Sequence, residues 1–211
     1  MKRTVNRFTA FMLAVTLIFG MLAFGASAAK EKNVARISVL CLVRSPGHVW
    51  IYVENLTSKP IKVGAYTVPA KKGVSVGTFG PTRYDGYGIY YNVESYCQTE
   101  YGMTGLSSMT EDLTADELAV VHNGILNYRN SWGVFTNCIA FATRIWNLVS
   151  ERKLNNLVFP AFTNIQMSFK RCQKDAVVQK AVDADDVYRQ VGNGSNATLK
   201  NVKAISLRDL K

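Results

Sequence analysis

The chain has 211 residues and a formal net charge of +10, from 25 Lys and Arg residues against 15 Asp and Glu residues. This length suits one domain of ordinary size, and no basic run interleaved with aromatic residues indicates a nucleic-acid partner. The positive charge favours an anionic cell-wall polymer or a membrane surface, and it fits plain solubility equally well.

The first 28 residues have the pattern of a signal peptide. Three basic residues in the first seven precede an uncharged apolar stretch at 8–24, and the small residues ASA at 26–28 form a cleavage site. The alternative is a retained membrane anchor, because the apolar stretch is nearly long enough to span a bilayer. Cleavage predicts a secreted protein, either free or associated with the cell wall, that starts at Ala29 and carries a formal charge of +7 instead of +10.

Strands separated by turns are expected through the first part of the mature chain. The turn residues SPG at 45–47 and KKG at 71–73 separate segments of alternating or continuous apolar residues. This spacing is typical of an antiparallel meander. The expected strands cover 36–43, 48–54, 61–68, 74–78 and 89–96.

The hydrophobic period then changes to that of helices. Thr114 and Glu117 form a capping box before one helix, a second helix should run from Cys138 to about Ser150, and Pro160 suits the first turn of a third. Asn193-Gly194 predicts a hairpin turn between 187–191 and 197–202. We therefore expect one α+β domain over 29–211, with a helical and hairpin extension from about residue 155.

Cys138 is the candidate nucleophile. Asn137 can cap the helix, which places Cys138 in the first turn, where unpaired N–H groups favour a thiolate. The same N–H groups could receive the oxyanion of a tetrahedral intermediate. The alternative is a buried core thiol, because Phe135, Ile139 and Phe141 surround it in the sequence.

The chain contains two histidines, and they compete for the role of general base. His48 begins a strand directly after a Pro-Gly turn, where a side chain can reach a cleft, although a solvated turn residue is the simpler explanation. His122 lies beside the apolar face of the first helix and is expected to pack against the core. We therefore predict that His48 serves Cys138.

The other three cysteines, Cys41, Cys97 and Cys172, also lie in the exported part of the chain. Export permits disulfides, and two bridges are the simplest arrangement of four cysteines. If Cys138 is a nucleophile, at most one internal pair can form. No CxxC or CxxxH spacing indicates zinc, and no metal or organic cofactor is implied.

Two motifs carry a resemblance to a known superfamily. The run HVWIY at 48–52 resembles the histidine strand of NlpC-type cell-wall peptidases, and NCIAFA at 137–142 resembles the nucleophile helix of the lecithin:retinol acyltransferase-like group. The histidine precedes the cysteine, which is the order of the circularly permuted members. The resemblance covers about 37–147. It implies a permuted papain-like α+β fold, an antiparallel sheet or half-barrel packed against a nucleophile-bearing helix, and thiol chemistry on amide or ester bonds.

The third catalytic residue departs from the family pattern. Family enzymes place a polar residue on the strand after the histidine strand, but 61–67 contains no His, Asn or Gln. Three side chains are candidates to orient the imidazole: Thr67, if it faces His48, and Asn92 or Glu94 from another strand. We prefer Asn92, for which the alternative is a strand-end residue that bonds its own backbone.

The sequence therefore predicts a secreted cysteine hydrolase with Cys138, His48 and Asn92 as catalytic residues. Its expected substrate is an amide bond, first of all in peptidoglycan stem peptides. Two alternatives stay open: a catalytically silent wall-binding module on the same scaffold, and a lipid acyl hydrolase or transferase. The expected partners are a peptide, peptidoglycan or lipid-amide substrate and an anionic wall surface, with no nucleic acid, and the chain is expected to be a monomer.

Overall fold

The computed structural model describes residues 32–44, 47–80, 86–129 and 132–202, so the predicted signal peptide at 1–28 lies outside the described residues. The described part is a mixed α/β unit. Its strands are β1 Ala35–Leu42, β2 His48–Asn55, β3 Ile61–Val63, β4 Tyr66–Val68, β5 Gly73–Phe79, β6 Gly88–Tyr91, β7 Ser107–Leu113, β8 Gln173–Lys174, β9 Tyr188–Val191 and β10 Thr198–Asn201. Its α-helices are α2 Val93–Tyr101, α3 Ala115–Leu126, α4 Cys138–Val149 and α5 Pro160–Phe169.

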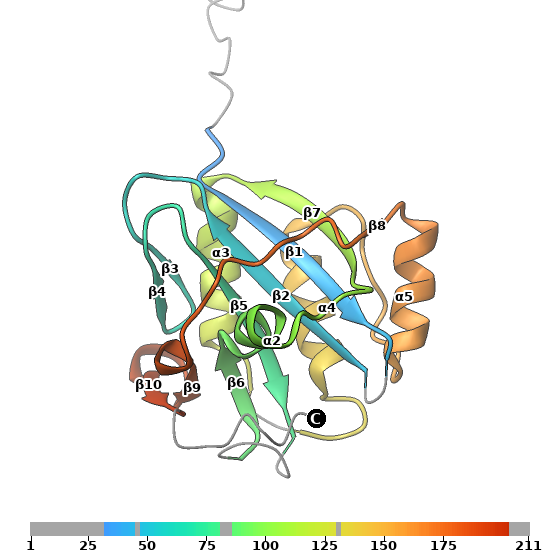
Figure 1. Ribbon diagram of the computed structural model, residues 1–211. Helices are drawn as coiled ribbons and strands as arrows, with labels where there is room; N and C mark the ends of the chain where they lie inside the picture. Colours follow the sequence, from blue (N-terminus) through green and yellow to red (C-terminus); the bar gives the residue numbers. More distant parts are fainter. Residues whose placement is uncertain (1–31, 45–46, 81–85, 130–131, 203–211) are drawn as a thin grey trace, which may run out of the picture. The chain divides into compact units, whose positions relative to one another are not determined.

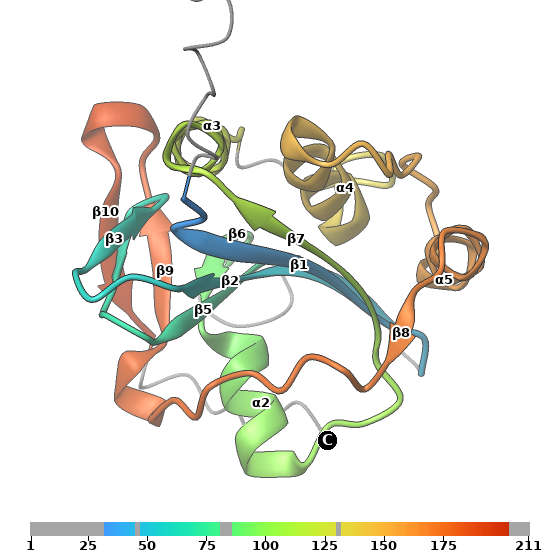
Figure 2. The same ribbon diagram turned by 90° about the horizontal axis from the view of Figure 1, so that it is seen from above.

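The main sheet has the strand order β10-β9-β6-β5-β2-β1-β7-β8, and neighbouring strands pair antiparallel. Helices α3, α4 and α5 cover one face of this sheet, and α2 lies on the other face (Figures 1 and 2). None of the described helices has both the length and the apolar composition needed to cross a membrane.

The sheet divides the buried core residues between its two faces, because successive strand side chains point to opposite faces. The largest group includes Val39, Ile51 and Val76 from the strands and Ile145 and Trp146 from α4. The side toward α2 buries two smaller groups: Leu40, Trp50, Tyr52 and Leu106 form one, and Phe79, Tyr90, Val93, Cys97, Val187 and Val202 form the other. Both faces of the sheet are thus covered, and most of the apolar core lies between the sheet and helices α3 and α4.

The predicted helices at 115–126, 138–149 and 160–169 are confirmed. The Thr114 hydroxyl accepts from the Glu117 N–H at 3.3 Å, and the Glu117 carboxylate accepts from the Thr114 N–H at 2.9 Å, so the capping box is closed. The expected C-terminal hairpin also forms, as β9 and β10, and it continues the main sheet through the pairing of β9 with β6.

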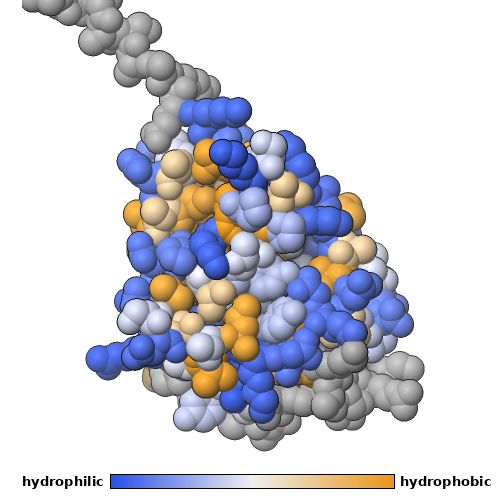
Figure 3. Space-filling view, turned by 90° about the vertical axis from the view of Figure 1, so that its left-hand side faces the viewer, coloured by the Kyte–Doolittle hydropathy of each residue, from blue (hydrophilic) through white to orange (hydrophobic). Residues whose placement is uncertain are grey.

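On the side of the molecule that carries β9, β10, β3 and β4, apolar residues are interspersed with hydrophilic ones (Figure 3).

Two strand predictions were wrong. The segment 61–68 is not one strand, because Gly64 adopts φ 55° and turns the chain into a separate two-stranded hairpin, β3 with β4. As a result β5, and not 61–67, is the neighbour of the histidine strand β2.

The expected strand at 89–96 ends at Tyr91. Asn92 adopts the left-handed conformation, with φ 69° and ψ 3°, and the chain continues as helix α2. A residue in this conformation cannot continue a strand, so the side chains after Asn92 leave the sheet and cross its face. The strand β7, beside β1, was not predicted.

Candidate active site

Cys138 is the first residue of α4, as the sequence predicted. The Asn137 side-chain oxygen accepts from the N–H groups of Ile139 at 3.0 Å and Ala140 at 3.2 Å, which fixes the start of the helix. The Asn137 amide also donates to the carbonyls of Val134 at 3.0 Å and Val158 at 3.4 Å. The Asn137 side chain therefore connects the start of α4 to the loop before Cys138 and to the chain before α5.

His48 is the first residue of β2 and pairs with Leu42 across the hairpin. Its ring stacks on two aromatic rings, Phe79 with a centroid distance of 4.6 Å and Trp50 with a centroid distance of 5.6 Å. The side chain is only 16% exposed. The imidazole is thus held in one plane by packing, which limits the directions in which its two nitrogens can point.

Glu94 holds one ring nitrogen of His48. Its Oε1 lies 2.9 Å from Nε2 of His48, and the carboxylate is 3% exposed. Glu94 stands in the first turn of α2, where the helix dipole favours a negative charge. Since Nε2 is occupied by Glu94, Nδ1 is the nitrogen left to face Cys138, whose thiol and the His48 ring shift each other's pKa.

Gly77 on β5 makes room for this contact. A Cβ atom at position 77 would overlap the Glu94 carboxylate and would lie 3.1 Å from Nε2 of His48. Gly77 stands beside Phe79, the ring on which His48 stacks, on the same face of the sheet. A side chain at this position would exclude the carboxylate from the ring, so we expect glycine to be required here for the His48–Glu94 contact.

Cys138 and His48 shift each other's pKa values in opposite directions. Burial raises the pKa of the Cys138 thiol, but the charge and the hydrogen bond of His48, with the N–H groups of Val49 and Ile139, bring it below its ordinary value. Burial lowers the pKa of His48, but the Cys138 thiolate and the Glu94 carboxylate together raise it well above the ordinary value. The arrangement therefore favours a thiolate–imidazolium pair, the reactive form of a catalytic cysteine.

Asn92, the predicted orienting residue, is not brought to the ring. Its Oδ1 is buried without a hydrogen-bond partner among the described residues, and its Nδ2 donates to the Asp186 carbonyl at 2.9 Å. Thr67 also lies elsewhere, where its hydroxyl accepts from the Lys62 ammonium at 2.6 Å. Asn92 instead makes the left-handed turn from which α2 starts, and it acts on the site through Glu94, two residues later.

His122 lies on α3, where it bonds to the backbone of Gly64, and burial lowers its pKa. Cys41, Cys97, Cys138 and Cys172 are all free thiols. Burial raises the pKa values of Cys41 and Cys97 to about 12 each. Within the part of the chain that the structure describes, no group of three or more His, Cys, Asp or Glu side chains is arranged to hold a metal ion.

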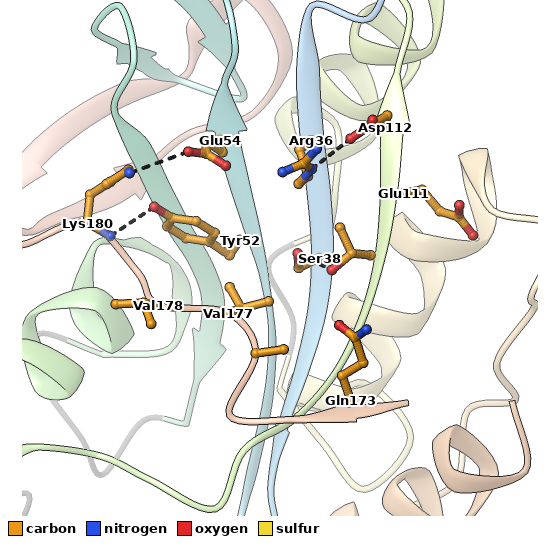
Figure 4. A pocket seen from close by; sticks show the side chains of 12 residues that line it. Arg36, Ser38, Tyr52, Glu54, Glu111, Asp112, Gln173, Val177, Val178 and Lys180 are labelled. Carbon is orange, nitrogen blue, oxygen red and sulfur yellow. Dashed lines mark hydrogen bonds and ion pairs between the residues drawn. The ribbon is translucent and has the colours of Figure 1, made fainter. Parts of the chain in front are cut away.

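A polar groove of about 850 Å³ lies on the α2 face of the sheet, and the segment that follows α5 borders it (Figure 4). The charged side chains that line it form ion pairs with one another or with a neighbour. The N···O distances are 2.7 Å for Arg36 and Asp112, 3.6 Å for Lys180 and Glu54, and 3.0 Å for Arg152 and Glu111. Neither Cys138, His48 nor Glu94 lines it. The groove is therefore separate from the candidate active site.

Sequence reasoning named Glu94 only as an alternative and missed Gly77. A local signal for Glu94 was present, because an Asn followed two residues later by a carboxylate suits the first turn of a helix. No local signal marks Gly77, whose importance depends on which strand pairs with β2. The comparisons with known proteins add nothing to this site, since no family model, no curated protein and no solved structure matches the chain.

Proposed function

We propose that this protein is a secreted cysteine hydrolase of the permuted papain-like superfamily. The observation that carries the proposal is the convergence of Cys138, His48 and Glu94, with Glu94 Oε1 2.9 Å from His48 Nε2 and the pKa of Cys138 lowered by the His48 ring. The antiparallel sheet, the helix that begins with the nucleophile and the order of histidine before cysteine all support this assignment. The departure from the family pattern is that the orienting carboxylate comes from a helix and not from a strand.

In the proposed mechanism, the Cys138 thiolate attacks the carbonyl carbon of an amide, and a C–S bond forms. The N–H groups of Ile139 and Ala140 are occupied by the Asn137 cap, so we assign the oxyanion to the N–H of Cys138 itself. As the C–N bond breaks, the His48 imidazolium gives its proton to the leaving amine. His48 then takes a proton from water, which attacks the thioester and releases the acid and the thiolate.

Glu94 has a positioning role in this scheme. By accepting the Nε2–H of His48 it fixes the tautomer that presents Nδ1 to the thiol, and it stabilises the imidazolium. The alternative of a silent wall-binding module was supported by the lack of an orienting group for His48. Glu94 can fill this role, and a buried carboxylate paired with a buried imidazole is not needed for binding alone, so the hydrolase is the favoured proposal.

A lipid acyl hydrolase or transferase is a second candidate. The residues just before the nucleophile, Val134 and Phe135, are 64% and 73% exposed. Exposed apolar residues at this position favour a substrate with an acyl chain over a purely polar peptide. The same thiol chemistry would then act on an ester or amide of a fatty acid.

The test is to incubate the chain from Ala29 with peptidoglycan stem peptides and, separately, with acyl esters and acyl amides. Product formation is followed by mass spectrometry, and Cys138→Ser is the matched control. The proposal expects release of a new amine or alcohol that Cys138→Ser does not produce. It is contradicted if no substrate of either class is turned over and the Cys138 thiol reacts no faster than an ordinary cysteine, in which case the binding module replaces it.

A further inference from the structure

The outer face of helix α5 is aromatic and exposed. Phe162, Ile165 and Phe169, at helical spacing, are 50%, 50% and 85% exposed, whereas Thr163 and Met167 on the opposite side are fully buried. Ile165 and Phe169 share one side of this helix, and that side faces solvent. An amphipathic helix that turns its large apolar residues outward leaves them for another surface.

This exposed face continues to the loop that leads into Cys138. We call the set the apolar rim. The side-chain amide of Asn156 donates to the Phe135 carbonyl at 3.2 Å, which joins the loop before Cys138 to the chain before α5. The rings of Phe159 and Phe162 pack edge to face, with their centroids 6.0 Å apart. Single exposed apolar residues are common on protein surfaces, but seven on two joined segments mark an interaction site. The apolar rim consists of Val134, Phe135, Leu157, Phe159, Phe162, Ile165 and Phe169.

The chain between Glu151 and Asp175, which includes α5, is basic. Its residues 152–174 contain five basic residues and no Asp or Glu. Among the described residues, Arg152 is the one of the five with a carboxylate partner, Glu111 at 3.0 Å. Lys170 and Arg171 directly follow Phe169 at the end of α5. Aromatic residues flanked by cations are the composition of helices that lie in the interface of an anionic bilayer.

We propose that the apolar rim docks this protein on an anionic lipid surface. Phe162, Ile165 and Phe169 would enter the boundary between headgroups and acyl chains, and Lys170 and Arg171 would lie against the headgroups. A second copy of the chain is a poorer occupant, because a two-fold contact through α5 would bring two uncompensated basic segments together. The inference goes beyond the proposed hydrolysis and does not depend on it.

The test is co-sedimentation with vesicles, using the chain from Ala29, which retains the compact unit Asn33–Lys211 and the core that it contains. The vesicles contain equal parts of phosphatidylglycerol and phosphatidylcholine, or phosphatidylcholine alone. We expect the wild type and Cys138→Ala to bind the anionic vesicles. The double variant F162D/F169D should lower the partition coefficient by about tenfold or more, because two aromatic side chains lose their burial.

The charged flank and a matched control complete the test. K170Q/R171Q should weaken binding to the anionic vesicles about fivefold for each charge removed. Val178→Asp, at a residue 79% exposed beside the polar groove, should leave binding unchanged. The inference is overturned if the wild type stays in the supernatant, if F162D/F169D binds as well as the wild type, or if the wild type is a dimer that this variant dissociates. Because Cys138→Ala is expected to bind without turning over substrate, failure of docking and failure of hydrolysis are distinguishable.

Discussion

Helices α4 and α2 lie on opposite faces of the sheet (Figure 2). Glu94 of α2 hydrogen-bonds to His48, and Cys138 of α4 raises the pKa of the same ring. Helix α4 buries mainly apolar residues, among them Phe141, Ile145 and Trp146, and its start is fixed by the Asn137 cap. Helix α2 buries Val93, Glu94, Ser95 and Cys97 and has no side-chain cap. The helix that carries the nucleophile is therefore held by hydrophobic packing, whereas the inner face of α2 is partly polar and its carboxylate occupies the space over Gly77.

The hydrogen bonds that hold α2 come from β5 and from the chain after α5. The Ser95 N–H donates to the Ser75 hydroxyl at 3.1 Å, and the Ser95 hydroxyl donates to the Gln179 side chain at 2.9 Å. Each such bond contributes only about 0.5–1.5 kcal/mol net, less than a large buried apolar side chain. Changes on the α2 side should thus alter the reaction more readily than the fold, and changes on the α4 side should alter both.

The largest effect is expected for the residue that both helices contact. His48→Ala should lower kcat/KM by about 10³-fold or more, because it removes the general base and the cation that stabilises the thiolate. His122→Ala should leave kcat/KM within about twofold and lower the melting temperature, since His122 packs beside β3 and away from the site. The measurements are turnover and thermal unfolding of both variants. Loss of turnover in His122→Ala at unchanged stability would show that the base is misassigned.

Gly77→Ala tests the α2 side without touching a charged group. The added methyl should displace the Glu94 carboxylate and lower kcat about tenfold or more, as loss of an orienting group does in other triads. In a Glu94→Ala background the same change should cost little, because no carboxylate remains to be displaced. The double-mutant cycle is measured by kcat at matched folded fractions. Additive effects of the two changes would contradict the role given to Gly77.

The pH profile separates the two partners of His48. The thiolate is present above the lowered pKa of Cys138, and the imidazolium is present below the raised pKa of His48, so kcat/KM should be bell-shaped between them. Glu94→Gln removes one of the charges that raise the pKa of His48. The falling limb should therefore move to lower pH, by about one unit or more. An unchanged falling limb would mean that Glu94 does not stabilise the imidazolium.

The smallest effects concern Asn92 and Thr67. Asn92→Ala should lower the free energy of unfolding by about 1–2 kcal/mol, because alanine is strained in the left-handed conformation, and Asn92→Gly should recover part of this loss. Thr67→Ala should change stability by about 0.5 kcal/mol or less. Chemical denaturation measures the free energy of unfolding of all three variants. If Asn92→Gly is no more stable than Asn92→Ala, the turn is not what Asn92 supplies.

The α4 side of the site could be predicted from the sequence because its signals are local. The Asn137 cap, the position of Cys138 and the apolar period through Trp146 all lie within ten residues. The same holds for the capping box of α3 and for Pro160 at the start of α5. Each of these depends on backbone groups one or two turns away and not on the tertiary fold.

The α2 side could not be predicted because, apart from the Asn92 and Glu94 pair that suits a helix start, its signals are not local. Glu94, Ser95 and Cys97 form the inner face of α2 as a mainly polar surface, so the apolar period that reveals a helix is missing. The contact of Glu94 with His48 further depends on β5 lying beside β2, and that pairing follows from the turn at Gly64, which takes 61–68 out of the sheet. Asn92 was predicted to orient the imidazole with its side chain, but it acts on the site through its left-handed backbone, from which α2 starts.

The most direct test of the account is the reactivity of the Cys138 thiol in the folded protein. Limiting iodoacetamide near pH 7, followed by mass spectrometry, compares it with Cys172, which is partly exposed, and with the buried Cys41 and Cys97. The account predicts that Cys138 is alkylated first although it is only 8% exposed, and that His48→Ala removes this advantage. Labelling of Cys172 before Cys138 in the wild type, or no change in His48→Ala, would contradict the thiolate–imidazolium pair.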